Sequence, residues 1–318
     1  MNQLINSVLF SISITGPICL LLLLGIGLRR SQMMNEGFID GASKLVFNIA
    51  LPMLLFTSIA QTDFSQMASP SLIFYGIAAT LLAFVLLEWL AIRMTPDKRV
   101  RGILVQGAFR ANMGIVGLAY VNNAYGSQGV AAAAMYVACL TILFNILAVI
   151  TLNRSLNQDG SLPVKKVLKG IVKNPLILGI VAALPFAAGD WTVPDTLMKT
   201  GQYLAQMTLP LALLCTGASL SLKGGNAENR LLPAVTLLRL LAIPALITLG
   251  GYLVGFRDFE LAILFLINAS PTAAASYVMV RAMGGNAVLA ANIIAVTTLG
   301  SLLSTSLGAA LLKGIGWF

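Results

Sequence analysis

The sequence predicts an all-α membrane protein of ten transmembrane helices, arranged as two inverted repeats of five helices each. An apolar composition, a series of apolar runs of membrane-spanning length and a weak internal repeat support this prediction. Hydrophobic residues make up 58% of the 318 residues and charged residues only 10%, whereas a soluble domain carries about 25% charged residues. The composition therefore places the chain in a lipid bilayer.

The apolar runs are long enough to cross, as helices, a hydrocarbon core about 30 Å thick. A linker at residues 153–166, expected to be cytoplasmic, separates a first repeat, residues 1–152, from a second repeat, residues 167–318. We expect no soluble domain for separate chemistry. The predicted spans are residues 7–28, 38–61, 71–92, 102–122, 129–152, 167–188, 200–222, 231–254, 259–281 and 287–311.

The net charge of +9 orients the chain in the membrane and does not indicate a nucleic-acid partner. With the N-terminus placed outside, fifteen of the 20 basic residues fall on the inner side and three on the outer side. Cytoplasmic loops carry such an excess of Lys and Arg, so we expect both termini on the non-cytoplasmic side of the cell (inner) membrane. A nucleic-acid interface needs a basic patch on a folded polar surface, and we expect none.

Catalytic and metal chemistry is poorly supported by the residue types present. The chain has no histidine, and its cysteines, Cys19, Cys139 and Cys215, all lie inside predicted spans, as small buried residues commonly do. Neither a zinc site nor a histidine-based triad is available from this set. We therefore predict no enzyme activity, no metal site and no cofactor.

An offset of 158 residues aligns the two halves without a gap. LPMLLFTSIA, which contains Pro52, then meets LPLALLCTGA, which contains Pro210, and Asn112 meets Ser270. Because each half has an odd number of spans, the second half must be inverted relative to the first. Inverted repeats with interrupted helices in equivalent positions are typical of secondary transporters, whose substrate lies near the bilayer midplane.

Two spans carry residues that interrupt a helix. In the fourth span, within FRANMGIVGLAYVNNAYG, two glycines weaken the helix, and in the ninth a proline removes a backbone donor. Interrupted backbone is tolerated at membrane depth only where protein or a water-filled cavity covers it. The residues predicted to form the crossover or hinges are Gly114, Gly117, Pro271, Pro52 and Pro210.

Amides, hydroxyls and one cation lie beside these interruptions. Such groups either join helices or hold a polar ligand. Arg110 lies deep in its span, where an arginine costs about 2.5–3.5 kcal/mol unless it faces a cavity or partner. Arg239 is similarly deep, and no acidic residue lies at a span centre. Cations and amides without carboxylates suit an anion and not a metal cation. The predicted substrate-binding residues are Asn112, Arg110, Asn268, Ser270, Thr272, Ser276 and Thr57.

Four segments resemble the auxin efflux carrier family of membrane transporters: NIALPMLLFTSIA, RANMGIVGL, SPTAAASYVMV and TTLGSLLSTSL. The resemblance covers essentially the whole chain. It implies a fold of the bile-acid-transporter and sodium/proton-antiporter type. Helices 1, 2, 6 and 7 would form a scaffold domain and helices 3–5 and 8–10 a transport domain, with helices 4 and 9 unwinding and crossing. The family's fourth-span asparagine matches Asn112, and its ninth-span proline motif matches Pro271.

The chain departs from the plant members of that family at three points. Ala119 stands where they have a proline, and their second ninth-span proline falls near Ser276. The crossover would here depend on glycine and other small residues. The long cytoplasmic loop of many plant members is also absent.

Together these observations predict a secondary transporter for a small organic anion, a mono- or dicarboxylate, working by elevator-type alternating access as efflux or uniport. Asn112, Ser270, Thr272 and half-helix N-termini would hold the carboxylate, since helix dipoles favour negative charge there. A sodium-coupled organic anion symporter is one alternative, and an anion channel or ligand sensor on the same scaffold is another. Expected partners are the anion and the lipid bilayer, with a homodimer as a candidate assembly.

Overall fold

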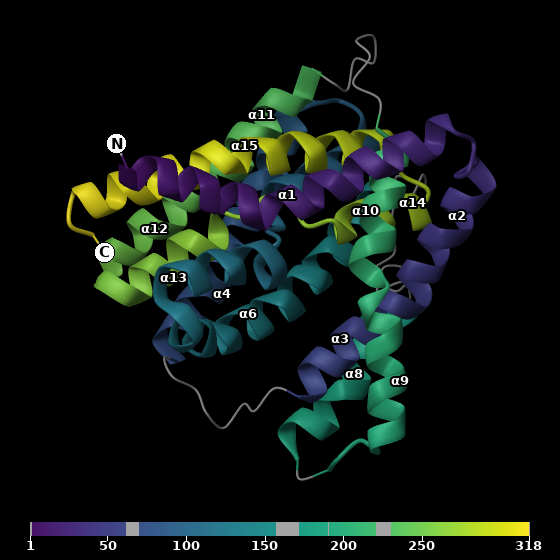
Figure 1. Ribbon diagram of the computed structural model, residues 1–318, viewed down its shortest axis with the longest axis horizontal. Helices are drawn as coiled ribbons and strands as arrows, with labels where there is room; N and C mark the ends of the chain where they lie inside the picture. The colour runs from purple at the N-terminus through teal and green to yellow at the C-terminus, as the bar shows by residue number, and fades with distance from the viewer. Residues whose placement is uncertain (1, 62–69, 157–171, 190, 221–229, 318) are drawn as a thin grey trace.

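The computed structural model describes residues 2–61, 70–156, 172–189, 191–220 and 230–317, and these residues form helices joined by short connections (Figure 1). The all-helical membrane fold is confirmed, whereas the inverted ten-helix arrangement stays a prediction. Most of the predicted linker lies outside the described residues. Five helical stretches within the described residues are long and apolar enough to cross a membrane: Glu36–Ala60, Pro70–Met94, Gln128–Leu156, Leu232–Val254 and Ala287–Gly314.

The first half of the chain contains one helix that runs through a π-helical turn and one that is interrupted. α2 continues through η1 into α3, and α6 bends at Gly126, whose φ is 64°. The elements are α1 (Asn2–Arg30), α2 (Glu36–Leu45), η1 (Val46–Ala50), α3 (Leu51–Ala60), α4 (Pro70–Met94), α5 (Lys98–Phe109), η2 (Met113–Gly117) and α6 (Leu118–Leu156).

The second half shows a similar pattern of helices. α11 continues through η4 into α12, and α13 and α14 are separated by non-helical residues. The elements are α8 (Pro175–Ala188), α9 (Asp195–Gln206), α10 (Thr208–Ala218), α11 (Leu232–Leu237), η4 (Leu238–Ala242), α12 (Ile243–Val254), α13 (Asp258–Asn268), α14 (Ala275–Ala282) and α15 (Ala287–Gly314).

Side chains in the connecting turns start several of these helices. Asn35, Asp97, Asn174 and Asn286 each accept a hydrogen bond from a backbone N–H in the first turn of the helix that follows. This satisfies one of the N–H groups that have no intrahelical acceptor. Gly255 ends α12 in the left-handed conformation, which glycine adopts without strain.

Most of the extensive helix contacts fall within two groups, α1–α3 with α8–α10 and α4–α6 with α11–α15, and α1 also packs along α15 (Figure 1). α3 packs on α8 and α9, and α1 packs on α10, whereas α4, α5 and α6 pack on one another, with α13 against α6 and α12. Gly25 and Gly217 bring α1 and α10 together, since a Cβ at either would strike backbone of the other helix. Small residues permit such close contact in membrane helices. The scaffold and transport domains that the family resemblance implies stay a prediction.

Two short segments, residues 110–112 and 269–274, interrupt the helices and lie against each other; we call them the crossover. Ala111 and Thr272 form an isolated antiparallel bridge. The N–H of Asn112 donates to the carbonyl of Pro271 at 2.8 Å, and that of Ala273 donates to the carbonyl of Arg110 at 3.0 Å. Non-helical backbone therefore stays buried here because each segment satisfies the other's polar groups.

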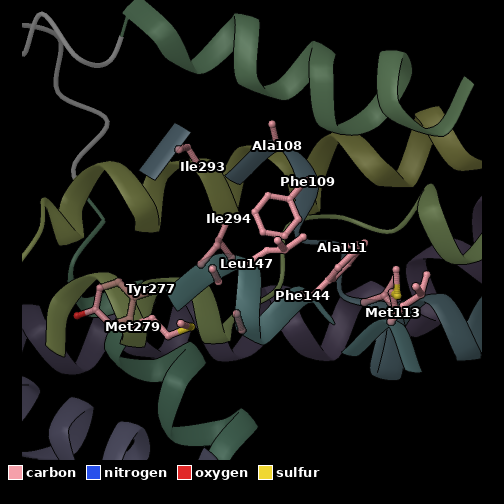
Figure 2. Packing of buried hydrophobic residues seen from close by; sticks show 14 of the residues in the cluster. Ala108, Phe109, Ala111, Met113, Phe144, Leu147, Tyr277, Met279, Ile293 and Ile294 are labelled. Atoms are coloured by element: carbon pink, nitrogen blue, oxygen red, sulfur yellow. The ribbon is translucent and has the colours of Figure 1, made fainter. Parts of the chain in front are cut away.

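Packing around the crossover is aromatic and close. The ring of Phe109 lies edge-on to those of Phe84 and Phe144, at centroid distances of 5.5 and 5.4 Å. Figure 2 shows Phe109 and Phe144 together in this buried cluster. A Cβ at Gly117 would lie 3.2 Å from the Cα of Ile267, an unusually tight contact, so η2 lies close against α13. The crossover is thus anchored on both sides.

Candidate functional site

A cavity of about 510 Å³ lies beside the crossover, within the size range of small-molecule sites. α3, α9 and α10 form one wall, and the crossover, η2, α6 and the start of α14 form the other. Most lining side chains are apolar, and none of the described lining residues is acidic. The polar lining residues are Ser58, Arg110, Asn112, Thr141, Asn145, Gln206 and Thr208.

Two helix N-termini open onto this cavity. Residues 112–115, at the start of η2, and residues 273–275, at the start of α14, all line it. The first N–H groups of a helix have no intrahelical acceptor, and the helix dipole adds partial positive charge there. Both termini therefore favour an anion in the cavity.

Arg110 is the single basic residue among the described residues that line the cavity. Only 4% of its surface is exposed. Its guanidinium donates to the sulfur of Met279 and, at 2.7 Å, to Oδ1 of Asn145. Asn145 in turn donates its amide to the carbonyl of Thr141 at 2.8 Å, which orients Oδ1 toward Arg110. Both acceptors of Arg110 are neutral, so the buried charge has no carboxylate partner among the described residues.

Asn112 and Thr208, which line opposite walls of the cavity, carry polar groups that have no partner among the described residues. Asn112 is 8% exposed, and its side-chain amide makes no hydrogen bond to a described residue, although its backbone is fully engaged. Thr208 is 4% exposed, and its Oγ1 has no partner among the described residues. A buried polar group without a partner costs about 1–3 kcal/mol. The amide of Asn112 is therefore a candidate to bind a ligand, whereas the hydroxyl of Thr208 is buried away from the cavity.

Three other predicted site residues turn their side chains toward backbone and do not line the cavity. Ser270 donates to the carbonyl of Ile267 at 2.8 Å, and Thr272 donates to that of Gly107 at 2.7 Å. Asn268 donates to the carbonyl of Leu264 and to the hydroxyl of a buried tyrosine. These side chains hold the crossover together.

The remaining predicted residues fall in several environments. Thr57 donates to the carbonyl of Met53 at 2.8 Å within α3. The hydroxyl of Ser276 is buried without a partner among the described residues, outside the cavity lining. Of the predicted hinge residues, Gly114 lines the cavity and Gly117 contacts α13. Pro271 lies in the crossover, Pro52 is buried in the first turn of α3, and Pro210 is an exposed residue of α10.

Arg239 has a different environment from Arg110. It is fully buried and does not line the cavity. Its Nη1 donates to the carbonyls of Ala108 and Phe109, at 3.1 and 2.8 Å, and its Nη2 donates to that of Asn268. Of the two deep arginines that the sequence left as alternatives, Arg110 is therefore the one that faces the cavity.

Sequence reasoning missed several lining residues. Asn145 carried a usable signal, because it is an amide inside the apolar run LTILFNILAV, and Thr141 lies one helical turn before it on the same face. Ser58 and Thr208 carried no such signal, since single hydroxyls are common in membrane helices. Their place in the cavity depends on how the two groups of helices pack.

Comparison with known proteins identifies the family of the chain. A family described as membrane transport protein matches residues 12–308. The chain belongs to this family, the auxin efflux carrier family. It is similar to an uncharacterized transporter of Methanothermobacter thermautotrophicus, with 25% identity over 297 residues, which covers 91% of this chain and 94% of that protein. The family predicted from the sequence is thus confirmed, and the protein is a multi-pass membrane transporter.

Proposed function

We propose that this transporter carries organic anions with one carboxylate and an apolar body, by secondary transport with alternating access. The observation that carries the proposal is the guanidinium of Arg110, which is buried at a mostly apolar cavity without acidic lining and has only neutral acceptors. A buried cation without a counter-charge is costly. An anionic ligand would supply that counter-charge.

Several donors converge where the carboxylate would lie. The guanidinium has five N–H donors, and the side chains of Met279 and Asn145 accept from two of its nitrogens. The free amide of Asn112 and the first N–H groups of η2 and α14 line the same part of the cavity. Hydrogen bonds to a charged partner each contribute about 1.5–3 kcal/mol, and we expect Arg110 to make the strongest of them.

The cavity favours a monocarboxylate over a dicarboxylate of similar size. Arg110 is the single cation in the described lining, and the walls beyond it are mostly apolar side chains with a few neutral hydroxyls and amides. A second carboxylate would lose its hydration without gaining a counter-charge. An apolar body would instead gain about 25 cal/mol per Å² buried.

The position of the cavity between the two groups of helices supports alternating access as the mechanism. In an elevator-type cycle, α4–α6 and α11–α15 would slide past α1–α3 and α8–α10, carrying the anion with Arg110. The membrane potential contributes about 2.3 kcal/mol per charge per 100 mV. For an anion in a cell with a negative interior this favours efflux by uniport.

Flux into proteoliposomes tests the proposal against its alternatives. We expect saturable uptake of radiolabelled cyclohexanecarboxylate, with or without a sodium gradient. The matched amide and dicarboxylate should compete at least about tenfold more weakly, the effect of about 1.4 kcal/mol. Uptake that requires a sodium gradient would favour the symporter, and non-saturating conductance would favour the channel. Equal competition by the neutral amide would refute the anion site.

A further inference from the structure

The carboxyl-terminal ends of both interrupted helices converge on one buried side chain, Arg239. α5 ends at Phe109 and α13 ends at Asn268. Arg239 donates to the carbonyls of Ala108, Phe109 and Asn268, so a single guanidinium binds both helix ends. Carbonyls in the last turn of a helix lack intrahelical donors, and the helix dipole concentrates partial negative charge there.

Side chains also satisfy the neighbouring carbonyls at these ends. Gly107 accepts a hydrogen bond from the hydroxyl of Thr272 at 2.7 Å, and Ala269 accepts one from Thr305 at 3.1 Å. The hydroxyl of Ser270 donates to the carbonyl of residue 267, and Arg239 donates to three of the other carbonyls. Every carbonyl at residues 107–109 and 267–269 therefore accepts a side-chain hydrogen bond. No group of free backbone oxygens remains at these two helix ends.

In transporters with interrupted helices, such helix ends and unwound carbonyls coordinate the coupling cation. In this chain the guanidinium of Arg239 lies in that place. It is 0% exposed and belongs to the π-helical turn η4. An arginine stays protonated in proteins, and a side chain cannot dissociate during a transport cycle.

We infer that Arg239 is a tethered cation, built into the place that a dissolved cation would occupy, and that it positions the anion site. Phe109, whose carbonyl it binds, directly precedes Arg110. The end of α13 leads into Pro271, whose carbonyl accepts the N–H of Asn112. Arg239 therefore acts through residues that line the cavity. The effect of Arg239 on anion binding rests on the proposed function. Its role as a cation that binds the two helix ends does not.

Chemical rescue tests this inference. Arg239→Ala should lower the melting temperature in nanodiscs and weaken binding of cyclohexanecarboxylate about tenfold or more. Methylguanidinium at about 20 mM should raise the melting temperature and restore affinity to within about threefold of wild type, whereas neutral methylurea should do neither. Arg257→Ala is the matched control, because Arg257 donates to carbonyls at the end of α12 in an exposed position. It should change neither anion affinity nor the response to methylguanidinium.

A second pair of variants covers the case in which Arg239→Ala does not fold. Arg239→Lys keeps the charge and Arg239→Gln keeps only a donor, so the lysine variant should bind the anion more tightly. Equal rescue by methylurea, or equal affinity of the two variants, would overturn the inference. The rescue of melting temperature is measured without anion. If the wild-type protein fails to bind the carboxylate, only the proposed function is refuted. If the wild-type protein binds the carboxylate but methylguanidinium does not rescue Arg239→Ala, only this inference is refuted.

Discussion

Neutralising Arg110 separates a ligand-binding role from a structural one. Arg110→Gln removes the charge but keeps a side-chain amide that can donate to Asn145. One charge-assisted hydrogen bond is worth about 1.5–3 kcal/mol, so affinity for cyclohexanecarboxylate should fall about 10- to 150-fold. The two helix N-termini at the cavity would remain, which is why some binding should persist.

The melting temperature of the ligand-free protein should not fall with the affinity when Arg110 is neutralised. Both acceptors of Arg110 are neutral, and its surface is 4% exposed. Removing a buried charge that lacks a counter-charge relieves a desolvation penalty, so the melting temperature without ligand should hold or rise. A structural arginine would instead lower the melting temperature on neutralisation.

Calorimetric titration and thermal unfolding in nanodiscs check both expectations. The matched amide, cyclohexanecarboxamide, should bind Arg110→Gln and wild type equally. Arg110→Lys tests the geometry, because a lysine is a point charge whereas the guanidinium offers a planar fork. If Arg110→Gln leaves carboxylate affinity within about twofold, under roughly 0.4 kcal/mol, Arg110 is not the counter-charge and the anion site would depend on the helix N-termini.

Three further predictions follow from the same geometry. Asn112→Ala should weaken carboxylate binding about 10-fold or more at unchanged melting temperature, and wild-type affinity would remove it from the site. Gly117→Ala should destabilise the protein by about 1–3 kcal/mol through overpacking against α13, whereas Gly114→Ala, whose added Cβ would meet open space, should be neutral in thermal unfolding. Arg281 of α14 pairs with Glu36 and Asp40 of α2 at 2.8 and 2.9 Å. Such exposed pairs contribute about 0–1 kcal/mol each, so loss of both in Glu36→Gln with Asp40→Asn should lower the free energy of unfolding by no more than about 2 kcal/mol but alter the transport rate. An unchanged rate would show that this contact does not open.

The fold class was predictable because the bilayer imposes a strict requirement on the backbone. Spanning segments must satisfy their own polar groups, so apolar runs of this length become helices. Pro271 marked the second interruption, since it lies between α13 and α14, whereas Gly114 and Gly117 lie in η2, just after the first interruption at residues 110–112. The crossing partner of each interruption is set by packing between distant segments, which no local pattern encodes.

The site was only partly predictable for a related reason. Within a helix, periodicity tells which side chains share a face, but residues 110–112 and 269–274 have no helical periodicity. Arg110 and Asn112 line the cavity, whereas Ser270 and Thr272 turn toward backbone carbonyls. Arg239 illustrates the same limit, because its acceptor at Ala108 is 131 residues away in sequence.

The net charge that crosses the membrane in one transport cycle distinguishes uniport from coupled transport. Arg110 and Arg239 travel out and back with the protein, so they contribute no net charge to a complete cycle, whatever their effect on its separate steps. Uniport of a monocarboxylate should therefore transfer one negative charge, and the reversal potential in potassium-clamped proteoliposomes should shift by about 59 mV per tenfold anion gradient. At 100 mV the potential contributes about 2.3 kcal/mol per charge, enough to sustain a gradient of about 50-fold. A dianion would halve the shift, and one-to-one coupling to sodium or a proton would abolish the dependence on potential. Because stoichiometry does not depend on affinity, Arg110→Lys should keep the same reversal potential even where its rate is lower, and a changed value would contradict the uniport mechanism.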